Sequence, residues 1–147
     1  MHVSRYAFGS LACIVIACNS ERVLAPRVAT IDGVPFRAQA SLVRDFMPST
    51  APGGPPLTVA IRIQTADSSS IPTGVAADSA WMYNGSAVWR TAVLEEQPRS
   101  SSYFDVIARG GPTWAPGTEV DVLVRLRDGA GHSVLLQTPP QRIARVD

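Results

Sequence analysis

The sequence predicts an all-β protein, a single antiparallel β-sandwich of about seven to nine strands, preceded by a signal-peptide helix. Three observations support this fold class. Apolar residues recur at every second position in several stretches, and the dipeptide Asn84-Gly85 is a strong hairpin signal. The segments between these stretches are rich in Pro, Gly and Ser. Beyond residue 27, no stretch shows a convincing helical spacing of apolar residues.

The strands are predicted where apolar and polar residues alternate, because successive side chains of a strand point to opposite faces of a sheet. Three stretches alternate clearly. Their expected inward residues are Phe36, Ala38, Ala40 and Leu42; then Leu57, Val59, Ile61 and Ile63; then Val120, Val122, Val124 and Leu126. Residues 103–108 and 142–146 are further strand candidates. Each of these strands is expected to have one buried face.

Turn chemistry places the connections between strands. Asn84 and Gly85 are expected to be the two turn residues of a hairpin, since both need a positive φ in the favoured turn. Asp32-Gly33 predicts a second, shorter hairpin, and residues 128–131 predict a third that leads into a strand at 132–138. Further loops are expected at 48–56, 66–76 and 97–102, and a turn at 92–96.

One hairpin carries a family resemblance. Residues 116–132 combine a Pro-Gly turn, an alternating strand and the loop Asp128-Gly129-Ala130-Gly131, and this resembles the last hairpin of bacterial immunoglobulin-like and fibronectin-III-like domains. The resemblance implies an immunoglobulin-like sandwich over residues 28–147. The chain departs from antibody-type domains because it lacks the cysteine pair between the sheets, and Trp81 is expected to be the core tryptophan of the third strand.

The N-terminus has the pattern of an export signal. Residues 1–5 are weakly basic and residues 6–17 are almost wholly apolar. This apolar run of about a dozen residues is shorter than the roughly 20 that a membrane-spanning helix needs. Residues 1–17 are therefore predicted to be a signal peptide.

The signal ends in Val15-Ile16-Ala17-Cys18, which resembles the lipobox of bacterial lipoproteins. The resemblance implies cleavage after Ala17 and a diacylglycerol on the sulfur of Cys18. Residues 18–27 then form a lipidated tether, and the protein is anchored to a membrane through two acyl chains, which hold it stably. Cys13 offers a rival lipobox with too short an apolar run before it, and an ordinary secretory signal with a chance cysteine is the other alternative.

Composition narrows the function classes. The chain has 13 Arg, no Lys and 12 acidic residues, and Arg5 lies in the predicted signal, so the mature chain is formally neutral. Nucleic acid is therefore not an expected partner. The absence of lysine excludes Schiff-base chemistry. Because Cys18 is lipidated and His132 is the only other mature histidine or cysteine, we expect no disulfide, no Cys/His metal site and no cofactor.

Candidate catalytic groups are sparse. His132 with Asp128 supplies two members of a hydrolase triad, but no Gly-x-Ser-x-Gly motif accompanies them. Glu95-Glu96 with Asp105 is a possible carboxylate pair, although adjacent acids on a strand face opposite ways. Asp128-Gly129-Ala130-Gly131 lacks the carboxylates of a calcium loop. Asn84-Gly85-Ser86 is a glycosylation sequon better explained by the turn. We therefore predict no catalytic residues and a protein that is not an enzyme.

The aromatic residues offer the main binding hypothesis. In a two-residue turn at Asn84-Gly85, Trp81 and Trp89 lie on opposite faces of the hairpin, so one tryptophan is core and the other exposed or covered by a loop. Trp114 lies in a loop rich in turn-forming residues. Trp89 and Trp114 are the candidate binding patch, because aromatic residues often anchor interfaces.

Together these features predict a cell-envelope lipoprotein with a non-catalytic binding or structural module. Its expected partners are the membrane, through the lipid, and an envelope protein. Asn19 replaces the Asp that marks inner-membrane retention in some enteric bacteria, which favours the outer membrane, with the domain in the periplasm or at the cell surface. A sandwich-fold protease inhibitor is the alternative, supported by fold analogy alone, and a small hydrolase is a further one.

Overall fold

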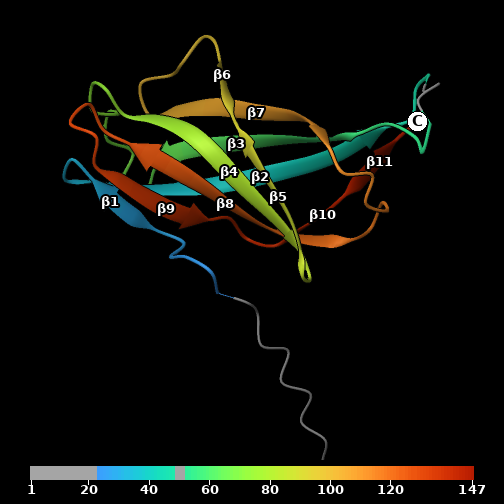
Figure 1. Ribbon diagram of the computed structural model, residues 1–147. Helices are drawn as coiled ribbons and strands as arrows, with labels where there is room; N and C mark the ends of the chain where they lie inside the picture. The colour runs from blue at the N-terminus through green and yellow to red at the C-terminus, as the bar shows by residue number, and fades with distance from the viewer. Residues whose placement is uncertain (1–22, 49–51) are drawn as a thin grey trace, which may run out of the picture.

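The computed structural model describes residues 23–48 and 52–147, so the predicted signal-peptide helix and Cys18 lie outside the described residues. The described chain folds into two antiparallel sheets packed face to face as a β-sandwich (Figure 1). The predicted all-β sandwich class is confirmed. None of the described residues forms a helix long and apolar enough to cross a membrane.

The described residues form eleven strands. They are β1 (Ala29–Ile31), β2 (Val34–Asp45), β3 (Leu57–Thr65), β4 (Ala76–Asn84), β5 (Ala87–Ala92), β6 (Leu94–Glu96), β7 (Tyr103–Gly111), β8 (Glu119–Arg127), β9 (Ser133–Gln137), β10 (Gln141–Arg142) and β11 (Ala144–Val146). The number exceeds the seven to nine expected because β6 forms where no strand was expected, and because the last stretch of the chain is divided into β10, which pairs with β8, and β11, which pairs with β2.

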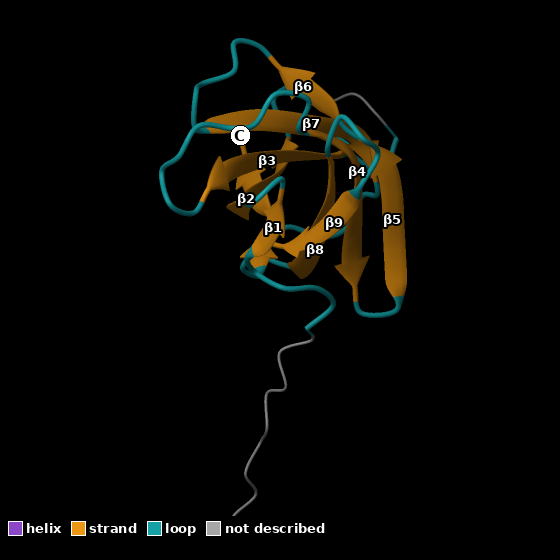
Figure 2. Cartoon of the chain, turned by 90° about the vertical axis from the view of Figure 1, so that its left-hand side faces the viewer, coloured by secondary structure: helices purple, strands orange, loops and turns teal. Residues whose placement is uncertain are grey.

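The two layers are visible from the side in Figure 2. One sheet has six strands in the order β1-β2-β3-β7-β6, with β11 pairing alongside β2, and the other has five strands in the order β10-β8-β4-β5, with β9 pairing alongside β8. All pairs are antiparallel except β11 with β2. The last segment of the chain therefore leaves one sheet and closes on the other.

The core lies between the sheets and is built by the predicted alternation. Its fully buried large side chains include Phe36, Leu42, Leu57, Ile61, Ile63, Met82, Phe104, Leu126 and Leu136. The inward positions of β2 continue past Leu42 to Arg44, whose side chain is only 5% exposed. An arginine thus occupies the last inward position of this strand, at one end of the sandwich.

The hairpin between β4 and β5 forms with a different register from the one expected. Asn84 pairs with Ala87, so the two turn residues are Gly85 and Ser86 and the prediction that Asn84 is a turn residue is wrong. Only Gly85 has a positive φ, which fits a turn with glycine at its first central position. The first strand of the hairpin gains Asn84 and the second begins at Ala87, one residue later than expected, and both faces keep their predicted side chains.

Three other connections agree with the prediction to different extents. Asp32 and Gly33 form the turn between β1 and β2, and both have a positive φ, as a type I′ hairpin requires. The predicted hairpin between β8 and β9 also forms, with His132 in its loop rather than in the strand. Residues 94–96, however, form strand β6 where we expected only a turn. The chain moves from the five-stranded sheet to the six-stranded sheet there, since β6 pairs with β7.

Candidate functional site

The outer face of the five-stranded sheet is the main candidate site. One row of cross-strand partners runs across it from Gln137 on β9 through Leu123 and Trp81 to Arg90 on β5. Side chains directly opposite one another in a sheet share a face, so these four groups lie on one surface. The neighbouring rows add Leu135 and Arg125 on one side, and Asp121, Tyr83 and Val88 on the other.

Trp81 lies at the centre of this surface between two arginines. The Arg90 guanidinium carbon is 5.3 Å from the centre of the Trp81 ring, and that of Arg125 is 5.9 Å away. Both distances are within cation–π range. Ala80 and Met82 take the inward positions on either side of Trp81, so the prediction that Trp81 is the core tryptophan is wrong. Trp81 is half-buried and faces outward.

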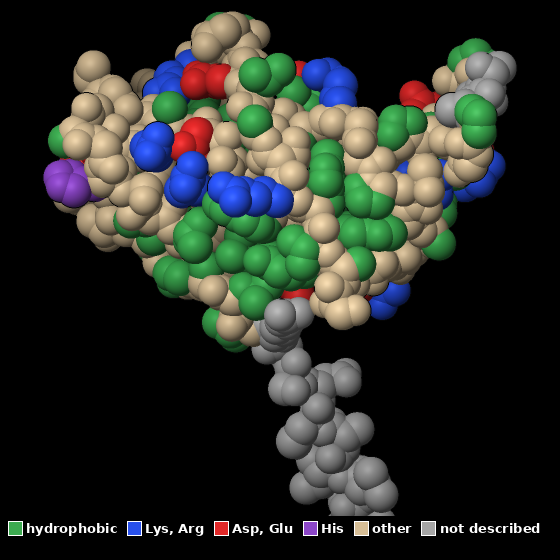
Figure 3. All heavy atoms as spheres, viewed as in Figure 1, with side chains coloured by type: hydrophobic (Ala, Val, Ile, Leu, Met, Phe, Trp, Pro, Cys, Tyr) green, Lys and Arg blue, Asp and Glu red, His purple; other side chains and the backbone are tan. Residues whose placement is uncertain are grey.

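Hydrophobic groups surround Trp81 on this face. Leu135 is 39% exposed and Val88 is 51% exposed, while Leu123 is buried beneath its neighbours. Figure 3 shows hydrophobic side chains gathered on the front of the molecule below a band of arginines. We call the set Trp81, Tyr83, Val88, Arg90, Leu123 and Leu135 the aromatic face. Trp, Tyr and Arg are the residues most enriched at the energetic centres of interfaces.

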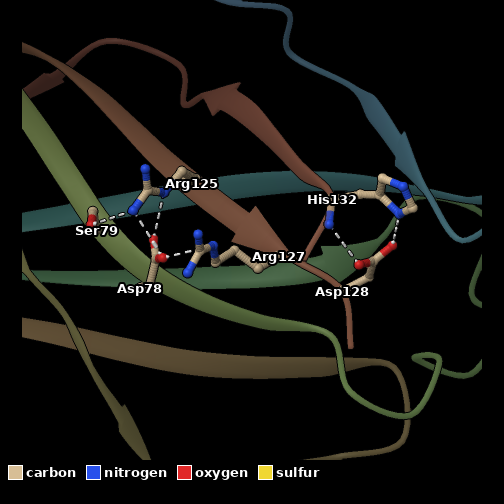
Figure 4. Close-up of polar contacts among 6 residues, drawn as sticks. All are labelled: Asp78, Ser79, Arg125, Arg127, Asp128 and His132. Atoms are coloured by element: carbon tan, nitrogen blue, oxygen red, sulfur yellow. Dashed lines mark hydrogen bonds and ion pairs between the residues drawn. The ribbon is translucent and has the colours of Figure 1, made fainter. Parts of the chain in front are cut away.

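An ion-pair cluster borders the aromatic face (Figure 4). Arg125 donates two hydrogen bonds to the carboxylate of Asp78, Nε to Oδ1 at 2.8 Å and Nη2 to Oδ2 at 2.9 Å. Arg127 Nε lies 3.2 Å from Asp78 Oδ2. The hydrogen bonds from Arg125 outweigh the effect of burial and lower the pKa of Asp78 below its ordinary value of about 3.8. Two arginines share one carboxylate, so the cluster keeps a net positive charge.

This lowered pKa makes a prediction about pH. A carboxylate with a depressed folded-state pKa stabilises the protein above its unfolded pKa, and the stabilisation is lost as the pH falls through the folded value. We expect Asp78→Asn to be less stable than the wild type at pH 7. The difference should narrow below about pH 3.8. Guanidinium denaturation of both proteins from pH 7 to pH 2.5 measures the difference in their free energies of unfolding. A difference that stays constant over this range contradicts the lowered pKa of Asp78.

The start of the described chain lies against the same face. The backbone amides of Leu24 and Ala25 donate to the side-chain oxygen Oε1 of Gln137 at 2.6 and 3.0 Å. The backbone amide of Gln137 donates to the Pro26 carbonyl at 2.9 Å. Gln137 is fully buried by this contact. Part of the predicted tether, residues 24–26, is thus hydrogen-bonded to the edge strand β9.

The predicted binding residues Trp89 and Trp114 are placed differently from the aromatic face. Both are partly buried and pack against the hydrophobic core. Trp89 faces inward beside Met82 and covers Gly111 of the opposite sheet, where an added Cβ would lie 2.5 Å from the ring. Trp81 and Trp89 lie on opposite faces of the hairpin, as the alternation predicted. Trp81, which the sequence did not single out for binding, is the outward one.

His132 and Asp128 do come together. His132 Nδ1 lies 2.9 Å from Asp128 Oδ2, and the His132 amide donates to Asp128 Oδ1 at 2.9 Å. The Asp128 side chain is buried while that of His132 is 80% exposed. Asp128 also accepts from the Ala130 amide, so its carboxylate ties the hairpin loop together. This pattern is that of a turn-forming aspartate.

The other carboxylates considered as acid–base groups are held by arginines. Arg99 donates to both oxygens of Glu95 at 2.7 Å, and Arg62 donates to both oxygens of Asp105 at 2.8 and 2.9 Å. These hydrogen bonds lower the pKa of Glu95 and of Asp105. Glu95 and Glu96 belong to β6. Within residues 23–48 and 52–147, no three His, Cys, Asp or Glu side chains form a group able to hold a metal ion.

Comparison with known proteins adds no family. No protein-family model matches the chain, and no curated protein sequence matches it.

Proposed function

We propose that the protein is a cell-envelope lipoprotein, anchored through Cys18, that presents an immunoglobulin-like sandwich as a non-catalytic binding or structural module. The observation that carries the proposal is the aromatic face itself. An outward tryptophan and tyrosine beside Arg90, Val88 and Leu135 have the composition of a docking surface. The chain also enters the fold beside this face, six residues after Cys18.

The strand order supports the immunoglobulin-like assignment. In that fold, strands A, B, E and D form one sheet and strands C, F and G the other. The neighbours β2-β3-β7-β6 correspond to A-B-E-D, and β4, β8 and β9 correspond to C, F and G. The correspondence follows chain order in both sheets. It supports describing the two packed sheets as an immunoglobulin-like sandwich.

The ion pairs support a role without catalysis. A carboxyl group whose pKa is lowered is ionised at neutral pH and is a weak base, so it is poorly suited to act as a general acid or base. Glu95, Asp105 and Asp78 each have this property and each bridges to an arginine. Arg62 and Asp105 join β3 to β7, and Arg125 and Asp78 join β8 to β4. These two pairs are cross-strand pairs, and Arg99 holds Glu95 from the loop between β6 and β7.

The anchor is tested by metabolic labelling. Cells that express the wild type or Cys18→Ser are grown with a clickable fatty-acid analogue and the protein is recovered. We expect the wild type to carry the label and to fractionate with the outer membrane, and Cys18→Ser to remain unlabelled and uncleaved. Cys13→Ser is the matched control and should be labelled like the wild type. An unlabelled wild-type protein, or label lost in Cys13→Ser alone, contradicts the anchor at Cys18.

A further inference from the structure

The position at which the chain enters the fold limits how far the domain can stand from an anchor at Cys18. Leu24, near the start of the described chain, is hydrogen-bonded to the sandwich, and it follows Cys18 by six residues. Six residues span at most about 22 Å when fully extended. A compact domain of this size is roughly 35 Å across. The surface around Leu24 therefore stays close to the bilayer that holds the lipid.

That surface is the aromatic face. Leu24 and Ala25 contact the side chain of Gln137, and Gln137 stands in the same cross-strand row as Leu123, Trp81 and Arg90. The point at which the described chain meets the sandwich and the outward tryptophan are thus on one side of the domain. Val23, at the start of the described chain, is an apolar residue that is 73% exposed.

The chemistry of the face fits the polar boundary of a lipid bilayer. Tryptophan and tyrosine concentrate at membrane interfaces because their rings have an apolar body and a polar edge. Arginines near the surface are attracted to anionic headgroups. On and beside the aromatic face, Arg90, Arg125 and Arg127 outnumber the acidic residues Asp78 and Asp121. The net charge there is positive although the mature chain is formally neutral.

We propose that the aromatic face lies against the bilayer, with Trp81 and Tyr83 at the level of the headgroups and Arg90 on lipid phosphates. The proposal rests on the anchor at Cys18. It gives the sandwich a fixed orientation, in which the outer face of the five-stranded sheet is turned to the membrane. The outer face of the six-stranded sheet, which carries the Arg62–Asp105 and Arg109–Glu96 pairs, is then turned to the aqueous side.

Quenching of tryptophan fluorescence by brominated lipid tests this orientation. The protein is purified from membranes, its acyl chains are verified by mass spectrometry, and it is reconstituted into vesicles of phosphatidylcholine and phosphatidylglycerol with bromine near the headgroup end of one chain. The contribution of Trp81 is the difference between the wild type and Trp81→Phe. We expect brominated lipid to reduce the Trp81 emission at least twofold, and to reduce the remaining emission of Trp89 and Trp114 much less.

Charge variants test whether Arg90 contributes to this orientation. Arg90→Glu should lower the quenching of Trp81 about twofold, and Arg109→Glu, the same charge change on the other sheet, should leave it unchanged. A lipidated protein whose Trp81 is unquenched overturns the orientation while the anchor stands, and cross-linking of Val88→Cys then shows whether a second copy or another envelope protein covers the face instead. A protein without acyl chains overturns both the anchor and the orientation.

Discussion

Replacing Arg44 with methionine is expected to lower the free energy of unfolding by about 3 kcal/mol, because several charge-assisted hydrogen bonds are lost together. The guanidinium is buried and donates to four backbone carbonyls. Nε reaches Pro55 at 2.8 Å, Nη1 reaches Thr113 at 3.2 Å and Trp114 at 3.1 Å, and Nη2 reaches Gly53 at 3.2 Å. A single side chain therefore ties the loop after β2 to the loop after β7.

Two opposing effects decide the size of this loss. Burying a guanidinium costs several kcal/mol of hydration, so a hydrophobic replacement recovers part of that energy. Methionine, however, leaves four carbonyls without their donor. The bond to Pro55 is buried and the other three are partly buried, and an unsatisfied buried group costs about 1–3 kcal/mol. We expect the second effect to exceed the first. Guanidinium denaturation followed by tryptophan fluorescence measures the difference.

Two further variants control for charge and for side-chain loss. Arg44→Lys keeps the charge, but one ammonium group cannot reach carbonyls on both loops, so an intermediate loss is expected. Arg109→Met removes an arginine that is 65% exposed, and its effect should stay within about 0.5 kcal/mol. If Arg44→Met were as stable as the wild type, the hydration cost would dominate and the four hydrogen bonds would contribute little.

The strands were predictable because one face of each is buried. In β3, the residues at alternate positions from Leu57 to Ile63 are buried as the alternation predicted. A strand of this kind has one arrangement that hides its apolar residues, since a shift of one residue would expose all of them. The turn at Asp32-Gly33 was predictable for a similar local reason, because both residues tolerate a positive φ.

The features that the sequence did not reveal depend on contacts between distant segments. The alternation of β2 places position 44 inward, but the carbonyls that satisfy Arg44 come from loops 9 to 70 residues away. The strand β6 contains Glu95 and Glu96 and has no apolar alternation of its own. Its strand conformation comes from pairing with β7. Neither feature has a signal within its own few residues.

The candidate site was predicted in part. The alternation predicted that Trp81 and Trp89 point to opposite faces, and it could not tell which faces inward. The opposite sheet decides this, because Gly111 lacks the side chain that would otherwise meet the Trp89 ring. The outward position then falls to Trp81, beside the arginines of β5 and β8.

Because Trp89 faces inward and Trp81 outward, we expect their alanine variants to differ in stability. Trp89→Ala removes a ring that packs against the core and covers Gly111, and we expect it to lower the free energy of unfolding by about 2–3 kcal/mol. Trp81→Ala removes a half-buried outward ring and its contacts with Arg90 and Arg125, so a loss of about 1 kcal/mol or less is expected. Thermal denaturation followed by circular dichroism compares the two, and the reverse order of stabilities would contradict the assignment.

A double-mutant cycle at Gly111 separates close packing from simple loss of apolar area. In Gly111→Val alone, the new side chain meets the Trp89 ring, which must leave its position, so the variant is destabilised. In Gly111→Val with Trp89→Ala, the valine enters space that the ring has vacated, and the combined loss should be smaller than the sum of the two single losses. Additive losses would mean that Trp89 and Gly111 stabilise the sandwich independently. The coupling, if it is found, identifies this contact as the reason that Trp89 is the inward tryptophan and Trp81 the outward one.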